Sequence, residues 1–525
     1  MPEIIICKKN ALKLVTTFNL AFAVLASANA PAQALQFNFT YAPDTRQEVI
    51  DGFKQAGNFW SSQLKDTYVN PTCRCNTQTT VNISINYGQL SNANALSGTR
   101  PRMVRLSYQD YLTQAFQDIT SASDLLAFQN LQIGSNNKSI IGSILQGKTL
   151  SQVNLNDIKK LNRNSVQLAS SQFSMLVNTS SRLTFDNAQN LKYIGSNAVV
   201  DNNGNDNNQK IWLTSANAKA FNLIPGNNKG FDAQIMISNS MLTNTGDFIK
   251  DSIWDFSRVY NPELKKVDAN KYDFVSAAAH EIGHALGFVS GVDAFDILTS
   301  VAANSGSNPI TDKDLTYVSP LDLFRYSDDS KQNKVFDWSK GGNKYFSIDG
   351  GATDLANFDG NNYQGSHWQA ANNVSSMLGV MNPTLKKGNV LSISNLDLQL
   401  LDVIGWDLNS KFVDQTGLKL HKNIKVDITS SLFDNAITRS TSTSKATGIR
   451  YWQNMDDKYM EASQYTETQH IEDPSVENAS LDQLFDVDHD HDHEQQTSVP
   501  EPNAIAALSL IGLWGIGRLF KRHRK

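Results

Sequence analysis

The sequence predicts an α+β fold built on a mixed, twisted sheet that helices cover. Three neighbouring segments support this prediction. The stretches "LQFNFTY" (35–41) and "TVNISINYG" (80–88) alternate apolar and polar residues, which is typical of half-buried strands. Between them, "TRQEVIDGFKQAGNFWSSQL" (45–64) repeats apolar residues at helical spacing. A strand, a helix and a second strand in this order favour a sheet with a helix on one face.

The apolar positions assign a buried face to each of these elements. The buried face of the helix carries Val49, Phe53, Ala56, Trp60 and Leu64, and that of the second strand carries Val81, Ile83, Ile85 and Tyr87. Residues 90–230 are polar, and beyond helical fragments such as "YQDYLTQAF" (108–116) their periodicity assigns no element. Further on, "FDAQIMIS" predicts a strand with Phe231, Ala233, Ile235 and Ile237 on one face. "SISNLDLQLLDVIGWD" (392–407) predicts a helix that begins with a capping box of Ser394 and Asp397.

Length and charge restrict the class of protein. The 525 residues suffice for one large domain with appendages or for two domains. The net charge of −5 argues against a nucleic-acid partner, because phosphate binding requires a basic face. Three cysteines are present, and Cys73 and Cys75 form a close pair in "PTCRC". The pair could be a redox or metal-binding site, or it could be a local disulfide or two free thiols in a loop. Cysteine metal sites normally have wider spacing, which favours the disulfide or free thiols.

Both ends of the chain are typical of targeting segments. Residues 1–34 have a basic start, a short apolar run and small residues, which predicts a signal peptide cleaved after Ala34, with Ala30 as the competing site. Residues 35–410 form the predicted globular domain, 411–470 an extension, and 471–498 an acidic linker. The linker carries three histidines that offer weak metal binding: His489, His491 and His493.

The last segment, 499–525, resembles the PEP-CTERM sorting signal of Gram-negative bacteria. It combines "VPEP", an apolar stretch at 504–517 and a basic cluster. The resemblance implies processing by an exosortase and export to the cell surface or the extracellular matrix. Without processing, the apolar stretch would act as a short transmembrane tether, which is the membrane contact that the sequence predicts.

The segment "DFVSAAAHEIGHALGF" (273–288) predicts a metal-binding helix. His280 and His284 lie one turn apart on the same helical face, so both imidazoles can reach one zinc ion. Glu281 is placed beside the first ligand and can act as general base for a zinc-activated water. Asp273 is the predicted N-cap, and Gly287 allows the helix to end in a sharp turn.

A catalytic zinc site needs a third protein ligand. A downstream glutamate is excluded by the absence of glutamate between Glu281 and Glu461, and Ser290 occupies the place that a third histidine takes in the short motif HExxHxxGxxH. Asp293 and Asp296 offer carboxylates a little further on. The histidines that follow His284 before residue 470 are His367 and His421. His367 and Asp293 therefore remain as the principal alternatives.

The region around His367 resembles leishmanolysin-type metzincins. "HALGF" continues the zinc motif, a His-Trp pair follows a long insertion, and "GVMNP" (379–383) is similar to the methionine turn, with Met377 as a weaker candidate than Met381. The resemblance covers the motif helix and residues 367–383, while the cysteine content and the N-terminal half differ from the family. It implies His367 as the third zinc ligand, Met381 beneath the metal, and a zincin-like protease with an active-site helix and a looser C-terminal subdomain.

The function implied is that of a secreted zinc endopeptidase acting on protein or peptide substrates. In zincins a strand placed like 231–238 forms the sheet edge that pairs with substrate, and an interior strand is the alternative. The competing hypothesis is a surface or matrix-binding protein on a zincin scaffold with lost catalysis; the intact Glu281 argues against it. Calcium is a further candidate cofactor, because the loop at 201–206 is rich in oxygen ligands.

Overall fold

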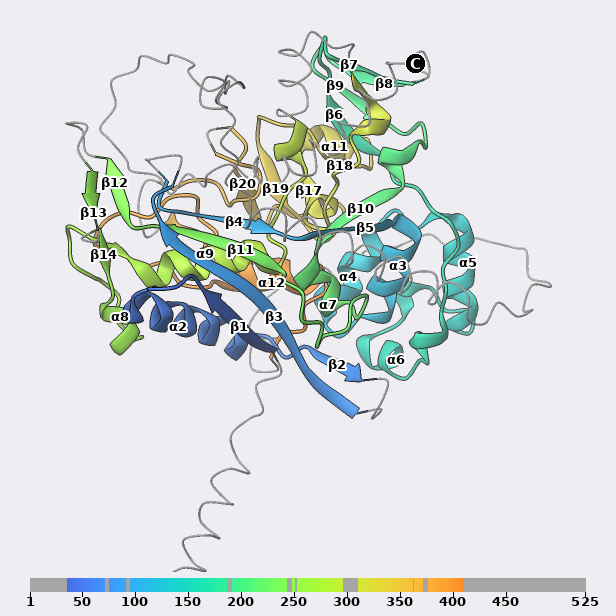
Figure 1. Ribbon diagram of the computed structural model, residues 1–525. Coiled ribbons are helices and arrows are strands. Elements are labelled where there is room, and N and C mark those ends of the chain that lie inside the picture. The colour runs from blue at the N-terminus through green and yellow to red at the C-terminus, as the bar shows by residue number, and fades with distance from the viewer. Residues whose placement is uncertain are drawn as a thin grey trace, which may run out of the picture.

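The computed structural model describes residues 35–409, except 71–74, 91–94, 187–190, 243–247, 251–252, 296–309, 362 and 372–375. The predicted signal peptide, extension, acidic linker and sorting signal lie outside the described residues, as do Cys73 and Asp296. The described part is a mixed α+β fold with several sheets (Figure 1). Cys75 is disulfide-bonded, which supports the structural interpretation of this cysteine.

The largest sheet has five strands and is mixed. Its main order is β1 (Leu35–Tyr41), β3 (Cys75–Gly88), β11 (Ala233–Ser238) and β4 (Ser97–Pro101), and β2 (Thr67–Asn70) pairs with β3. β1 and β11 run parallel to β3, whereas β4 runs antiparallel to β11. The strand at 231–238 is therefore interior, and the edge-strand alternative for it is wrong. Phe231 lies outside the strand and is 53% exposed, so its assignment to one strand face with Ala233, Ile235 and Ile237 is also wrong.

Two helices pack side by side near this sheet. α2 (Gln47–Gln63) crosses from β1 to β3, and its predicted face is buried, as is Leu64 just beyond it. α9 (Phe274–Leu286) lies against it (Figure 1). The approach is close at Gly52, where a Cβ would meet the Phe274 ring at 2.4 Å. The indole of Trp60 donates to the carbonyl of Ala279 at 2.9 Å. This contact ties α2 to the helix that carries the zinc motif.

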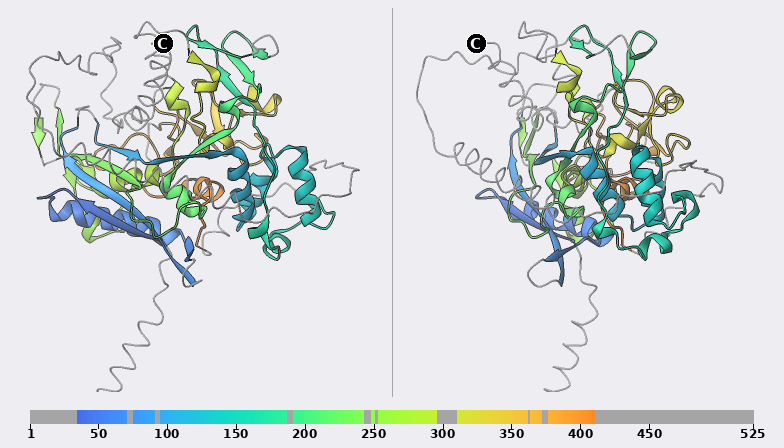
Figure 2. Two further views of the ribbon diagram at one scale, coloured as in Figure 1. Left: turned by 45° about the vertical axis from the view of Figure 1, so that its right-hand side comes forward. Right: turned by 90° about the vertical axis from the view of Figure 1, so that its right-hand side faces the viewer.

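Helices form a second group beside the sheet, on the right of Figure 1 and facing the viewer in the right panel of Figure 2. The group comprises α3 (Tyr108–Gln117), α4 (Ala122–Asn130), α5 (Gly134–Ile144) and α6 (Leu155–Lys159). α3 confirms the predicted helical fragment at 108–116. Ser107 and Ser121 cap α3 and α4 by accepting backbone N–H groups of the first turn.

Short strands complete the fold, and several pair segments far apart in the chain. β5 (Met103–Ser107) pairs with β10 (Lys210–Thr214), and β6 (Met175–Asn178) joins β8 (Lys192–Ile194), β9 (Ala198–Asp201) and β18 (Phe336–Asp337). β17 (Arg325–Tyr326), β19 (Lys344–Phe346) and β20 (Ala356–Phe358) form another sheet. The remaining pairs are β7 (Leu183–Thr184) with β16 (Ile310–Thr311), β12 (Ser240–Leu242) with β13 (Phe248–Lys250), and β14 (Trp254–Asp255) with β15 (Tyr272–Asp273).

Short helices connect these strands. They are α7 (Ser215–Ala220), α8 (Ser257–Tyr260) and α11 (Asp328–Gln332), with the 3₁₀ turns η1 (Leu150–Gln152), η2 (Arg163–Ser165), η4 (Asp206–Asn208), η5 (Asp312–Asp314) and η6 (Leu321–Phe324). The last helix, α12 (Asn395–Val403), begins at Ser394 with the predicted capping box to Asp397.

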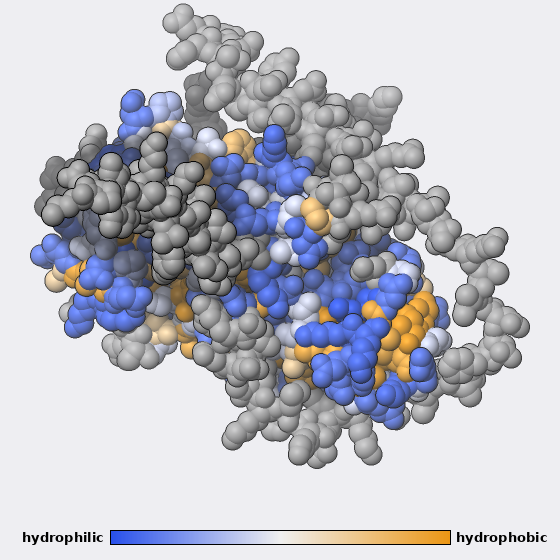
Figure 3. All heavy atoms as spheres, turned by 90° about the horizontal axis from the view of Figure 1, so that it is seen from below, coloured by the Kyte–Doolittle hydropathy of each residue, from blue (hydrophilic) through white to orange (hydrophobic). Residues whose placement is uncertain are grey.

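The described surface exposes few large apolar side chains, namely Tyr193, Phe231 and Tyr260. Seen from below, most of the coloured atoms are hydrophilic, with smaller apolar patches between them (Figure 3). Among the described helices, none is both long and apolar enough to cross a membrane.

Candidate metal centre

The helix α9 is fixed at both ends and buried along its length. Asp273 caps it by accepting from the backbone N–H of Ser276 at 2.9 Å, as predicted, and pairs with the buried guanidinium of Arg258 at 2.5 Å. Gly287 ends the helix with a φ of +126°, a conformation that favours glycine. The two ends therefore hold the intervening motif in one orientation.

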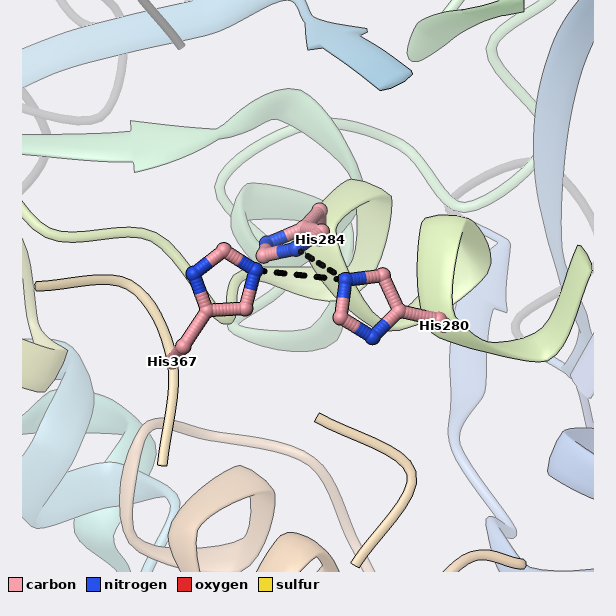
Figure 4. A group of neighbouring side chains, drawn as sticks. All are labelled: His280, His284 and His367. Atoms are coloured by element: carbon pink, nitrogen blue, oxygen red, sulfur yellow. Dashed lines mark hydrogen bonds between the residues drawn. The ribbon is translucent and has the colours of Figure 1, made fainter. Parts of the chain in front are cut away.

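Three histidines converge on one point beside this helix. His280 and His284 project from α9, and His367 comes from a loop on the opposite side, with all three rings pointing toward one another (Figure 4). The Nε2 atoms of His280 and His284 are 3.1 Å apart, and those of His367 and His280 are 3.3 Å apart. All three residues are at most 3% exposed, and one ligand atom from each lies within 4.8 Å of the other two.

Backbone carbonyls determine which nitrogens can face a metal. Nδ1 of His280 lies 2.8 Å from the carbonyl oxygen of Val380, and Nδ1 of His284 lies 2.6 Å from that of Phe288. A carbonyl oxygen only accepts, so both Nδ1 atoms carry the proton in a neutral ring and both Nε2 atoms present lone pairs. Two such lone pairs at 3.1 Å repel each other, and we therefore do not regard this contact as a hydrogen bond.

The geometry fits a tetrahedral zinc ion. Zn–N bonds of about 2.0–2.1 Å at tetrahedral angles place two ligand nitrogens about 3.3 Å apart, close to both of the separations here. Carbonyls that hold Nδ1–H are the usual orienting partners of metal-ligating histidines. The three imidazoles thus form a donor set for one cation, with room in the coordination shell for a further ligand.

The loop segment around His367 is held from both sides. The backbone N–H of Asp359 donates to the carbonyl of His367 at 3.0 Å, and that of Trp368 donates to the carbonyl of Met381 at 3.1 Å. The buried indole of Trp368 stacks on Phe358 and meets the Phe288 ring edge-on. Trp368 and Phe288 are therefore core residues that position the neighbouring histidines.

The predicted methionine turn lies directly beneath α9. Met381 is fully buried, and its sulfur is so close to the helix that a Cβ on Gly283 would meet it at 2.3 Å. Asp397, at the start of α12, accepts from the backbone N–H of Val380 at 2.9 Å and from the Trp368 indole at 2.7 Å. One carboxylate thus joins the turn that orients His280 to the residue that follows His367.

Glu281 lies on α9 next to His280 and is fully buried. The hydroxyl of Thr99, on the edge strand β4, donates to Oε2 of Glu281 at 2.6 Å, and it lies 3.0 Å from the carbonyl of the same residue. A fixed carboxylate beside three converging imidazoles is suited to proton transfer from a water in the site. This contact also joins the edge strand β4 to the part of α9 that carries the histidines.

The alternative third ligand, Asp293, lies outside the histidine group. Its Oδ1 accepts from the backbone N–H of Gly365 at 2.6 Å, two residues before His367. Burial raises the pKa of Asp293 to about 6. Ser290 donates to Asp322 at 2.6 Å. The structure thus brings together His280, His284 and His367, and it gives Asp293 the role of holding the His367 segment.

Sequence reasoning did not identify Thr99 or the bridging role of Asp397. Thr99 belongs to a five-residue strand, "SGTRP", with no apolar alternation. Asp397 was recognised only as a cap. A partner far away in the chain leaves no local pattern, so neither role had a sequence signal.

Comparison of the chain with protein-family models, with curated proteins and with solved structures returns no match.

Proposed function

We propose that the protein is a zinc-dependent endopeptidase in which His280, His284 and His367 hold the metal and Glu281 is the general base. The observation that carries the proposal is the convergence of three buried imidazole Nε2 atoms beside a buried glutamate. Zinc, when bound in such a site, lowers the pKa of a water toward neutrality and polarises a substrate carbonyl.

The residues of the chain supply the proton transfers. Glu281 takes the proton of the attacking water and passes it to the leaving amine nitrogen. The Thr99 hydroxyl, at 2.6 Å from Oε2, limits rotation of the carboxylate, so the same group is positioned for both transfers. The Val380 and Phe288 carbonyls keep two imidazoles in the tautomer that ligates through Nε2.

The edge strand β4 is the proposed binding surface for the peptide substrate. β4 pairs with β11 on one side and is the last strand in the order of the described sheet, while Thr99 in its middle contacts Glu281. An extended peptide added to this edge would form main-chain hydrogen bonds independent of its sequence. Its backbone would then run past the three histidines, which suits an endopeptidase.

The mixed sheet, the helix α9 and the segment carrying His367 and Met381 support a zincin-like arrangement of two subdomains, with a relation to leishmanolysin-type metzincins. Secretion through residues 1–34 and sorting through 499–525, with an exosortase as partner, belong to the same proposal. They rest on the sequence alone.

Hydrolysis of casein or gelatin by the zinc-loaded chain tests the activity. Glu281→Gln keeps the size of the side chain but removes the base, so we expect the rate to fall by about 10²–10⁴-fold with zinc content unchanged. The control is Glu263→Gln at an exposed position, which should cleave at the wild-type rate. If zinc-loaded wild type cleaves neither substrate nor a peptide library, the binding-scaffold alternative is correct.

Zinc stoichiometry tests the third ligand separately. His367→Ala leaves two ligands, and we expect it to lower zinc affinity by at least about 10-fold. Asp293→Asn keeps an acceptor for the Gly365 N–H and should bind one zinc like wild type. Loss of zinc in Asp293→Asn with retention in His367→Ala would refute the proposed ligand set.

A further inference from the structure

A second group of buried oxygens lies outside the histidine site, in the loop between β9 and β10. Asp201 ends β9 and is fully buried, and Asp312, at the start of η5, is fully buried as well. The two carboxylates are close enough for their charges to repel. In the described part of the chain, neither aspartate forms an ion pair with a basic side chain.

Three oxygens of this loop are buried without a hydrogen-bond partner among the described residues: Asp201 Oδ1, Asn205 Oδ1 and Asn207 Oδ1. Asn207 is fully buried, and its Nδ2 donates to Asp201 Oδ2 at 2.6 Å. Two of the three oxygens, Asp201 Oδ1 and Asn207 Oδ1, therefore belong to side chains that are in contact. A buried oxygen without a hydrogen-bond partner destabilises the folded state, because it has lost its hydrogen bonds to water, and it calls for an explanation. Three in one short loop indicate a missing electrophilic partner.

We propose that this loop is a Ca²⁺ site formed by Asp201, Asn205, Asn207 and Asp312. Carboxylate and amide oxygens are the ligands that Ca²⁺ prefers, whereas zinc takes nitrogen and sulfur more readily. The three loop ligands lie within seven residues, at positions 201, 205 and 207, and Asp312 supplies a second carboxylate from a distant segment. Water completes the six to eight oxygens that Ca²⁺ requires.

Charge and burial support a cation at this place. Burial, with a smaller contribution from the carboxylate of Asp312, raises the pKa of Asp201 to about 6. A bound cation would offset both the burial of the Asp201 charge and its repulsion by the Asp312 carboxylate. With two carboxylates the site is weakly charged, so its Kd belongs in the range of about 10⁻⁴–10⁻³ M that extracellular calcium modules show.

The site joins segments that support the histidine centre. Asp312 accepts from the amide of Asn203 at 2.5 Å and from the backbone N–H of Asp186 at 3.3 Å. Downstream of Asp312, Asp322 accepts from Ser290 at 2.6 Å and from the backbone N–H of Gly291 at 2.8 Å, just after the end of α9. Calcium would therefore stabilise the segment on which the turn after α9 rests.

Thermal unfolding of the full chain tests the site. The chain is transferred to calcium-free buffer with one equivalent of zinc, and CaCl₂ is then added to about 10 mM, well above the expected Kd. We expect wild type to gain about 2–4 °C in Tm. Asp201→Asn and Asp312→Asn should both lose this gain. Asp201→Asn should also melt no lower than calcium-free wild type, because it removes the repulsion between the two carboxylates.

Two further variants distinguish calcium binding at this loop from a nonspecific effect of acidic residues and from misfolding of the variants. Asp206→Asn alters an exposed aspartate of the same loop and should keep the full gain. Asn207→Asp adds a carboxylate beside Asp201, so it should melt lower without calcium and gain more than wild type with it. An equal gain in wild type, Asp201→Asn and Asp312→Asn would refute the site, as would equal gains in Asn207→Asp and wild type.

Discussion

At the scale of single residues, the contact between Thr99 and Glu281 defines how the general base is held. Thr99 is 6% exposed and donates its hydroxyl to Oε2 of Glu281 at 2.6 Å. Thr99→Val keeps the shape of the side chain and removes the donor. We expect kcat for peptide hydrolysis to fall by about 10–100-fold, the range seen when residues that orient a metal site are changed, with KM and zinc content nearly unchanged.

Thr99→Ser is the matched control, because it restores the hydroxyl without the methyl group. Its kcat should lie within a few-fold of wild type. A role of Thr99 in strand packing alone would affect both variants through stability and would leave kcat of the folded enzyme unchanged. Wild-type kcat in Thr99→Val would therefore contradict a positioning role.

Individual site residues differed in how far the sequence could predict them. His280, Glu281 and His284 follow from helical periodicity, because the spacing by itself places both imidazoles on one face. His367 required elimination and a family resemblance, and the structure brings it to the other two. Asp293 lies near in the sequence, but the N–H of Gly365 occupies its Oδ1. Closeness in sequence thus did not predict the third ligand, because a hydrogen bond to a distant residue determines where the Asp293 side chain lies.

At the scale of elements, α12 holds the lower side of the site through Asp397. This fully buried carboxylate accepts from the N–H groups of Val380, Met381 and Ser394 and from the indole of Trp368. Asp397→Asn turns an NH₂ group toward these donors and leaves at least one without an acceptor. We expect the free energy of unfolding to fall by about 1–3 kcal/mol and zinc affinity by about 10-fold.

Chemical denaturation and a zinc titration with a competing chelator measure the two effects. The matched control is Asp402→Asn, the same change one and a half turns later on α12. Asp402 accepts one hydroxyl, from Ser121 at 2.6 Å, and faces other carboxylates, so its substitution should stabilise the fold. If both substitutions change stability in the same direction, the role assigned to Asp397 is wrong.

Elements with strong periodicity were predicted well, and the reason is burial on one side. β1, α2 and β3 each present one face to the core, and that face appears as alternation or as helical spacing. β11 was predicted as a strand, but its neighbours were not determined, because an interior strand and a one-sided edge strand can show the same alternation. The buried carboxylate of Asp232, paired with Lys219 at 2.6 Å, marks where β11 begins and leaves Phe231 outside.

At the scale of the whole molecule, residues 90–230 resisted prediction because their partners are distant. β6 pairs in parallel with β18, which follows it by about 160 residues, and β7 pairs with β16, which follows it by about 130 residues. Strands of two to four residues carry too few positions for an alternating pattern. Their pairing depends on tertiary contacts and is invisible in local sequence.

A buried acidic cluster at the junction of α4, α12 and the segments before them affects the stability of the entire fold. Burial and neighbouring carboxylates raise the pKa of four members, namely Asp66, Asp118, Asp124 and Asp402, and Lys65 and Arg163 are the basic groups that face the cluster. The members are Asp66, Asp118, Asp124, Asp402 and Asp407. Ser121 links two of them, since its backbone N–H donates to Asp124 and its hydroxyl to Asp402.

The cluster predicts that stability rises as the pH falls from neutral. Burial raises the pKa of Asp124 from 3.8 to about 6, so between these values the folded chain binds protons that the unfolded chain has released. The free energy of unfolding therefore increases as the pH falls through about 6, and this added stability is lost as the pH rises again.

Asp402→Asn removes one charge from the cluster. We expect it to stabilise the fold at pH 7 by about 1 kcal/mol, since one pKa unit corresponds to about 1.4 kcal/mol, and to flatten this pH dependence. Denaturant unfolding of both proteins between pH 5 and 8 measures the difference, in which the titration of unrelated groups cancels, and parallel pH curves would show that these carboxylates do not interact.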